Sequence, residues 1–206
     1  VILGSRGRSV LSTTQMYQVL ASGGQLQQLR AVRGVLDPKG KAINRYDFNA
    51  DPAQAGDAVA ARLVTLAMQG TVTYGTAHQL MADGLGPLQS AGKTGTSNDS
   101  RDSWYAGFTG DHLAVVWVGN DKNEPTGLYG ATGAMRVWSG LFSKLPSEPL
   151  RVGSEGIEWA WLDAAEYATT EEGCPGARRA AFVSGYMPPE HKTCQESSWL
   201  DWFRLN

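Results

Sequence analysis

The sequence predicts an α+β fold in which helices accompany an antiparallel sheet, followed by a small appended module. Three strand candidates joined by short loops predict neighbouring antiparallel strands. Helical patterns precede and follow these segments. After residue 146 the chain holds both of its cysteines, many short polar stretches and few periodic apolar runs. We therefore expect residues 1–146 to form the main domain and residues 147–206 a separate small module.

The first predicted elements are a helix and a hairpin. The Ser12-Thr13 pair offers hydroxyls that can cap a helix, and Gly23-Gly24 is expected to end it. Residues 31–36 and 41–46 alternate weakly on either side of an Asp-Pro-Lys-Gly turn. This pattern predicts a β-hairpin.

A second helix is predicted over residues 57–69, because apolar residues recur there at helical spacing. Its apolar face is expected to hold Val59, Leu63, Leu66 and Ala67. The glycine-broken stretch 70–85 that follows is expected to be a loop.

Three strands are predicted over residues 88–97, 103–109 and 113–119. The third is nearly all apolar, as expected of a central strand with both faces covered. Residues 133–145 predict a last helix. The side chains available there for burial are Met135, Val137, Trp138, Leu141 and Phe142.

Composition limits the function classes. The 206 residues are 42% hydrophobic and 18% charged, which allows a packed core. The net charge of −2 provides no positive electrostatic field that would attract nucleic acid. No stretch approaches the roughly 18 apolar residues of a membrane helix. The chain does not start with Met. We expect it to begin inside a longer protein, with any anchor upstream, and we expect no metal ion or organic cofactor.

The two cysteines, Cys174 and Cys194, lie close together in a loop-rich segment. Their spacing leaves two alternatives open, a disulfide made in an oxidising compartment and two unrelated thiols. A zinc site with His191 is disfavoured, because it offers three ligands and no strong fourth.

The segment Ser90–Ser97, Ser-Ala-Gly-Lys-Thr-Gly-Thr-Ser, holds the residues best suited to chemistry. On a strand, Thr94 and Thr96 share one face, with hydroxyls about 7 Å apart. Lys93 adds a positive charge, and Gly95 lets another backbone approach. Such an edge strand can pair with an extended peptide, hold its terminal carboxylate and aim amides at an oxyanion. The segment therefore suits acyl transfer on a peptide that ends in a free carboxylate.

Other interpretations of this segment compete. Lys-Thr-Gly is short enough to occur by chance. A phosphate-binding loop would need glycine where Pro87 stands. Ser90 and Lys93 spell the nucleophile motif Ser-x-x-Lys, but on a strand their side chains would face different sides. Asp99 and Asp102, which follow the motif, can form a general-base pair, although turn capping is favoured.

With this segment and several others, the chain resembles the class A penicillin-binding proteins, in particular the b-type branch of Gram-negative bacteria. The resemblance covers residues from about 10 to 146. It departs from the family at Ala77, where glycine is common, and at Arg136, where proline is frequent. The matching segments are Tyr17–Gly24, Gly75-Thr76, Ala91–Ser97, Asp102–Gly107, Trp117–Asp121 and Gly130–Ala134 with Trp138.

The resemblance implies the penicillin-binding serine transpeptidase fold. This is an αβα sandwich with a five-stranded antiparallel sheet, of which the chain holds only the later portion. It also implies that Lys93 acts in catalysis, supporting proton movement and positive charge. The backbone amide of Thr96 is expected to complete the oxyanion hole, and the implied substrate-binding residues are Thr94, Gly95, Thr96 and Ser97.

The implied activity is that of a peptidoglycan D,D-transpeptidase. A serine attacks the D-Ala-D-Ala bond of a stem peptide, D-alanine leaves, and a neighbouring stem's amine takes the acyl group; beta-lactam inhibitors acylate the same serine. The chain has no credible Ser-x-x-Lys or Ser-x-Asn of its own. In the family both motifs lie further toward the N-terminus. We therefore expect an upstream segment of the same enzyme to supply them.

The family also implies an upstream glycosyltransferase domain that uses a lipid-linked precursor, a single-pass anchor, and a site on the periplasmic face of the inner membrane. An outer-membrane lipoprotein activator is a further expected partner. In that compartment a Cys174–Cys194 disulfide is expected. Two rival functions stay open: a D,D-carboxypeptidase or beta-lactamase-type hydrolase, and a non-catalytic module that binds peptidoglycan or a partner protein.

Overall fold

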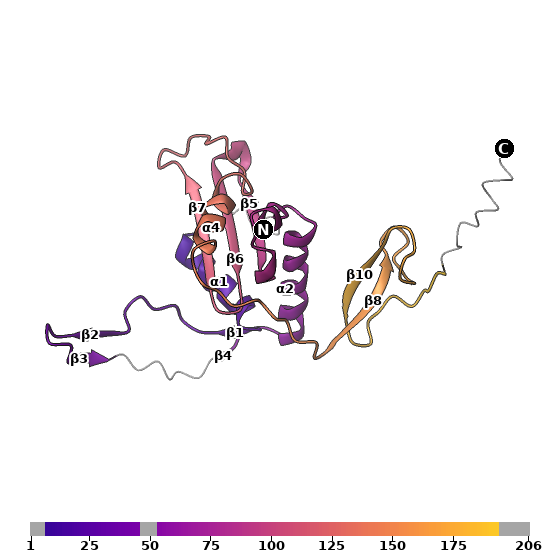
Figure 1. Cartoon of the computed structure of the whole chain (residues 1–206), viewed down its shortest axis with the longest axis horizontal. Helices are drawn as coiled ribbons and strands as arrows, with labels where there is room; N and C mark the ends of the chain where they lie inside the picture. Colours follow the sequence, from indigo (N-terminus) through magenta and orange to yellow (C-terminus); the bar gives the residue numbers. More distant parts are fainter. Residues whose placement is uncertain (1–6, 46–52, 194–206) are drawn as a thin grey trace. The chain divides into compact units, whose positions relative to one another are not determined.

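A computed structural model of the chain describes residues 7–45 and 53–193 (Figure 1). The chain divides into two compact units, Val1–Val152 and Gly153–Asn206. The division falls a few residues after the expected one, because Leu150 is buried against Met68, Ala91 and Phe108 of the first unit. The roles expected for the two parts stay predictions.

The first unit is built on a three-stranded antiparallel sheet in the order β5-β6-β7 (Figure 1). The strands are β5 (Ala91–Thr96), β6 (Asp102–Phe108) and β7 (Leu113–Gly119). All three predicted strands and their antiparallel order are confirmed, with β5 shorter than predicted. The prediction of β7 as the central strand is wrong for the described residues, where β6 takes that place.

The error has a physical reason in the packing of β7. Leu113 packs on the buried cluster around Phe108, as do Tyr17 and Leu20 of helix α1 (Val10–Ala21). Ala114 and Val116 pack on the cluster that contains Trp138 of helix α4 (Ala134–Phe142). Successive residues of a strand point to opposite faces, so β7 has a helix on each face. An apolar run indicates that both faces of the strand are covered. It does not indicate the position of the strand within the sheet.

Helix α1 (Val10–Ala21) begins one turn earlier than predicted. Ser9 is its N-cap, and the Ser9 hydroxyl accepts a hydrogen bond from the amide of Ser12 at 3.1 Å. The predicted Ser12-Thr13 cap is wrong, because both hydroxyls instead donate back to the Ser9 carbonyl from within the first turn. The predicted end at Gly23-Gly24 is confirmed, and both glycines adopt positive φ.

The predicted hairpin is confirmed as β2 (Gly34–Leu36) and β3 (Ala42–Arg45), which pair antiparallel. The Asp37 carboxylate accepts hydrogen bonds from two amides of the turn, and Gly40 takes the positive φ that closes it. The last predicted residue of the hairpin, Tyr46, lies outside the described residues. One short strand precedes this hairpin and one follows it. They are β1 (Gln25–Leu26) and β4 (Ala53–Gln54), and they pair antiparallel with each other.

Helix α2 (Ala58–Thr73) is longer than predicted, and its buried face differs. Asp57 caps it by accepting a hydrogen bond from the Ala60 amide at 2.7 Å. Ala67 is exposed, whereas the buried side chains lie at Ala61, Thr65, Met68 and Val72. Their spacing of four, three and four residues is also helical, so the periodicity identified the helix but not its inner face.

The predicted loop over residues 70–85 is wrong in part. Its beginning continues α2, and it also contains the short helix α3 (Gln79–Ala82), which precedes the 3₁₀ turn η1 (Gly86–Leu88). The helix continues through Gly70, and the Tyr74 ring packs over the position where a Cβ would stand.

Helix α4 (Ala134–Phe142) covers the main core. Trp138 is fully buried, stacks on Phe142 with ring centroids 3.8 Å apart, and meets the Tyr105 ring edge-on at 5.4 Å. Its indole nitrogen donates a hydrogen bond to the Gly107 carbonyl at 3.2 Å. Of the side chains expected to be buried on this helix, Val137 and Leu141 are exposed.

The second unit contains a three-stranded antiparallel sheet in the order β10-β8-β9. Its strands are β8 (Ile157–Asp163), β9 (Ala168–Thr170) and β10 (Ala177–Val183). Cys174 is buried before β10. Its expected partner, Cys194, lies outside the described residues, so the disulfide stays a prediction. Within residues 7–45 and 53–193, no helix has the length and apolar character needed to cross a membrane.

Candidate active site

The motif residues lie on β5 at the edge of the described sheet. Lys93 and Gly95 stand opposite Ala106 and Trp104 of β6, whereas Thr94 stands opposite Tyr105. Thr94 and Thr96 therefore share the face on which Tyr105 packs against α4, and Lys93 lies on the other. Both threonine side chains and that of Lys93 are at least partly exposed.

The backbone of β5 presents hydrogen-bonding groups along its outer edge. The Ser97 amide donates to the Asp102 carbonyl on the β6 side, at 3.1 Å. The Gly92 carbonyl points the other way and accepts the Thr71 hydroxyl of α2 at 2.7 Å. Since these directions alternate along an antiparallel strand, the amides of Thr94 and Thr96 point away from β6. Among the described strands only β6 pairs with β5. Beyond the Thr71–Gly92 contact with α2, the amides of Thr94 and Thr96 therefore have no strand partner on this edge.

The hydroxyl of Thr96 is held by a segment far away in sequence. The Gly130 amide donates to the Thr96 Oγ1 at 2.9 Å. Because the oxygen accepts this bond, its own proton remains free for an external acceptor. Gly130 sits so close to β5 that a Cβ there would lie 2.8 Å from the Thr94 Cβ and 2.9 Å from the Gly95 oxygen. Residues 130–134 are part of the family resemblance, but no local pattern predicts this contact across 34 positions of sequence.

The hydroxyl of Thr94 meets a second threonine. Thr76 Oγ1, on the turn between α2 and α3, lies 3.1 Å from Thr94 Oγ1, and either oxygen can be the donor. Thr76 was not among the predicted site residues, although Gly75-Thr76 was part of the resemblance. The sequence feature that could have indicated Thr76 is its place beside Gly75, in a turn that resembles the family's glycine-threonine turn.

Lys93 and Ser97 are engaged locally. The Lys93 Nζ donates to the Thr94 carbonyl at 2.8 Å, which keeps the positive charge at the outer edge of β5. The Ser97 Oγ accepts the Asp102 amide at 2.8 Å, so this hydroxyl closes the turn after β5. In these positions Lys93 can offer charge to a ligand. Because Ser97 only accepts here, its own proton stays available, and its expected role in substrate binding stays a prediction.

The alternatives weighed for this segment are not supported by the geometry. Asp99 pairs with Arg101 at 3.2 Å, and the Asp102 carboxylate accepts the Trp117 indole N–H at 2.9 Å. Both aspartates thus serve the turn and its neighbours. Ser90 is only 1% exposed and precedes β5, whereas Lys93 is exposed, so the two do not form a nucleophile pair.

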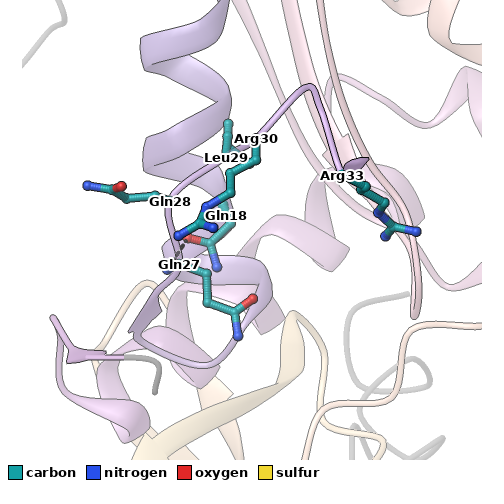
Figure 2. Close-up of a pocket in the computed structure, with 6 residues that line it drawn as sticks. All are labelled: Gln18, Gln27, Gln28, Leu29, Arg30 and Arg33. Carbon is teal, nitrogen blue, oxygen red and sulfur yellow. Dashed lines mark hydrogen bonds between the residues drawn. The ribbon is translucent and has the colours of Figure 1, made fainter. Parts of the chain in front are cut away.

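A cavity of about 480 Å³ lies beside α1, away from these residues (Figure 2). Gln18 already uses its amide there, donating to the Gln25 carbonyl and accepting the Gln27 amide. These hydrogen bonds hold the segment after α1 in place. The lining includes none of the predicted catalytic or substrate-binding residues. The residues that line the cavity are Gln18, Gln27, Gln28, Leu29, Arg30 and Arg33.

Comparison with known proteins shows which sequences this chain is similar to. The family described as the penicillin binding protein transpeptidase domain matches residues 7–134, more than half of the chain. The chain is 42% identical to Penicillin-binding protein 1B of Vibrio cholerae, over 76% of this chain and 20% of that protein. It is 38% identical to Penicillin-binding protein 1B of Escherichia coli, over 74% of this chain and 18% of that protein. The chain thus spans about a fifth of the length of these relatives.

Solved structures agree on the fold. The crystal structure of Penicillin-Binding Protein 1A from Haemophilus influenzae matches with a TM-score of 0.74 and 20% identity, covering 90% of this chain and 33% of that one. PonA1 from Mycobacterium tuberculosis matches with a TM-score of 0.54 and 24% identity, covering 69% of this chain and 40% of that one. The predicted fold class is therefore confirmed, as a portion of that fold.

Proposed function

The chain belongs to the penicillin-binding protein transpeptidase family, and on this premise we propose that it forms one wall of a peptidoglycan D,D-transpeptidase site. The observation that carries the proposal is the outer edge of β5. There the amides of Thr94 and Thr96 face away from β6, next to two threonine hydroxyls and the Lys93 ammonium. An extended peptide that ends in a carboxylate is complementary to this combination.

The proposed reaction begins when a stem peptide ending in D-Ala-D-Ala pairs with β5. The hydroxyls of Thr94 and Thr96 donate to its terminal carboxylate, and the Lys93 ammonium adds attraction. A serine from an upstream segment attacks the carbonyl carbon of the penultimate residue, and the Thr96 amide donates to the oxyanion that forms. The serine ester forms, the amide bond breaks, and D-alanine leaves with the serine proton on its amine.

The second half-reaction restores the enzyme. The amine of a neighbouring stem peptide attacks the ester, a new amide bond forms, and the proton that this amine loses returns to the serine oxygen. Water in place of the amine would give a carboxypeptidase. Measuring how the acyl group divides between an added amine and water separates the two activities.

The remaining parts of the proposal concern the longer protein. We propose that an upstream segment brings the Ser-x-x-Lys and Ser-x-Asn motifs, a glycosyltransferase domain for a lipid-linked precursor, and a membrane anchor that keeps the site at the periplasmic face of the inner membrane. The short share of the 1B relatives' length that the chain spans supports a longer protein. A lipoprotein activator is a further proposed partner.

The experiment is covalent labelling with a fluorescent penicillin. The longer protein should be acylated at one serine upstream of this chain, and the isolated 206-residue chain should not be labelled. Replacing Lys93 with Ala in the longer protein should reduce the labelling rate by two orders of magnitude or so, in the range that single catalytic groups contribute. Labelling of the isolated chain, or a longer protein that reacts equally well without Lys93, would contradict the proposal.

A further inference from the structure

The contact between Thr76 and Thr94 has no part in the function proposed so far. The two hydroxyl oxygens lie 3.1 Å apart, and the contact is exposed to solvent. Thr94 is one of the two residues proposed to hold the substrate's carboxylate. A hydroxyl that touches it affects where the Thr94 proton points.

Thr76 is brought to Thr94 by a specific arrangement of the turn after α2. The Thr71 hydroxyl donates to the outward Gly92 carbonyl at 2.7 Å, which fixes the end of α2 against the edge of β5. Gly75 follows, where a Cβ would lie 2.7 Å from the Thr71 Cα, so only glycine fits. Ala77 is fully buried, and its amide donates to the Thr71 carbonyl. With both neighbours held in this way, the exposed Thr76 side chain extends toward Thr94.

When two hydroxyls form a hydrogen bond, only one of them can donate its proton to the other. If Thr94 donates to Thr76, its proton is not available to a ligand. If Thr76 donates to Thr94, the Thr94 proton is free to point at a carboxylate. A bound anion favours the second arrangement, because each hydrogen bond in such a chain polarises the next and the last one is charge-assisted. Thr96 needs no such partner, since the Gly130 amide already donates to it.

We propose that Thr76 is a positioning residue for carboxylate recognition: it donates to Thr94, so that Thr94 donates to the terminal carboxylate of the stem peptide or beta-lactam. This inference rests on the proposed function. It predicts that Thr76 matters for ligands with a free carboxylate and not for the same ligands without one.

The test uses the longer protein and two probes, benzylpenicillin and its methyl ester, whose acylation rate constants are measured by competition with a fluorescent penicillin. Thr76→Val, which keeps the shape and removes the hydroxyl, should lower the rate constant for the free acid about five- to tenfold and that for the ester less than about twofold. Thr76→Ser should restore the rate for the acid. The matched control is Thr73→Val, because the Thr73 hydroxyl bonds only to carbonyls of its own helix.

The ratio of the two rate constants decides the outcome, because it is independent of how much of each preparation is folded. A Thr76→Val ratio equal to the wild-type ratio overturns the inference, whether both rates stay the same or both fall together. A Thr76→Ser variant that behaves like Thr76→Val also overturns it. A wild-type protein that reacts with neither probe contradicts the proposed function itself, which is a separate result.

Discussion

Replacing Gly130 with alanine tests whether the segment before α4 positions the threonines of β5. A Cβ at this position would lie 2.8 Å from the Thr94 Cβ, 2.8 Å from the Trp104 oxygen and 2.9 Å from the Gly95 oxygen. None of these atoms belongs to the end of a flexible side chain. Since ordinary Cβ contacts begin at 3.4 Å, either the segment or the strand must move by a few tenths of an ångström or more.

The size of the effect follows from this displacement. Overpacking of this kind costs about 1–3 kcal/mol of stability. The larger consequence concerns the site, because the Gly130 amide that donates to Thr96 moves with the segment. Misplacing reacting groups by about 1 Å can cost on the order of a hundredfold in rate. For a smaller shift we expect the acylation rate constant to fall about tenfold.

The assay is the rate of labelling by a fluorescent penicillin, measured in the longer protein. Gly140→Ala is the matched control, because a Cβ at Gly140 meets nothing within 4 Å and should leave the rate unchanged. If Gly130→Ala labels within about twofold of the wild-type protein, the close approach of this segment has no bearing on the site. The argument that Gly130 orients Thr96 would then be refuted.

Three further predictions concern stability and are measured by thermal or denaturant unfolding. Hydrogen bonds from Ser139, Gln79 and Arg136, together with the Arg136 charge, hold the pKa of Asp83 below its usual value of 3.8. Asp83 should therefore contribute stability above about pH 4, and this stability is lost as the pH falls through its lowered pKa. Asp83→Asn should remove this pH dependence. The expected loss of stability is only about 1 kcal/mol, because Arg136 is half exposed and solvent screens its charge. Trp138→Ala should destabilise the first unit by about 3–5 kcal/mol, whereas a loss under 1 kcal/mol would contradict the packing described for it. Reducing the predicted Cys174–Cys194 bridge should lower the stability of the second unit by about 3 kcal/mol, and two reactive thiols in the native protein would show that no bridge exists.

Local patterns in the sequence were sufficient for the elements themselves. Three strand candidates joined by short loops predicted β5, β6 and β7 in antiparallel order. The proline and glycine turn predicted the β2–β3 hairpin, and helical patterns predicted α1, α2 and α4. Each depends on residues within a few positions of one another, so the backbone preferences that decide it are written in the segment itself. The Lys-Thr-Gly-Thr segment on a strand belongs to the same class of prediction.

The failures have other causes. Ser9 rather than Ser12 caps α1, Ala67 faces solvent on α2, and β7 is not in the middle of the described sheet. In each case the pattern identified the element but not its exact start, its inner face or its place in the sheet. For Ala67 and β7, contacts with the rest of the chain selected one arrangement, and a local pattern does not contain those contacts. The Ser9 cap is a local hydrogen bond three residues long, so its misplacement is an error in choosing among neighbouring serines.

By itself, the sequence determined that Thr94 and Thr96 lie on one face of a strand, and it predicted that they hold an acidic peptide end. Only the tertiary structure decided how those hydroxyls are oriented. Thr76 reaches Thr94 across 18 positions of sequence, and Gly130 reaches Thr96 across 34. Such contacts form because α2 and α4 pack on the sheet and bring distant turns to its edge. No spacing rule within a segment can encode them, since packing of whole elements sets these distances.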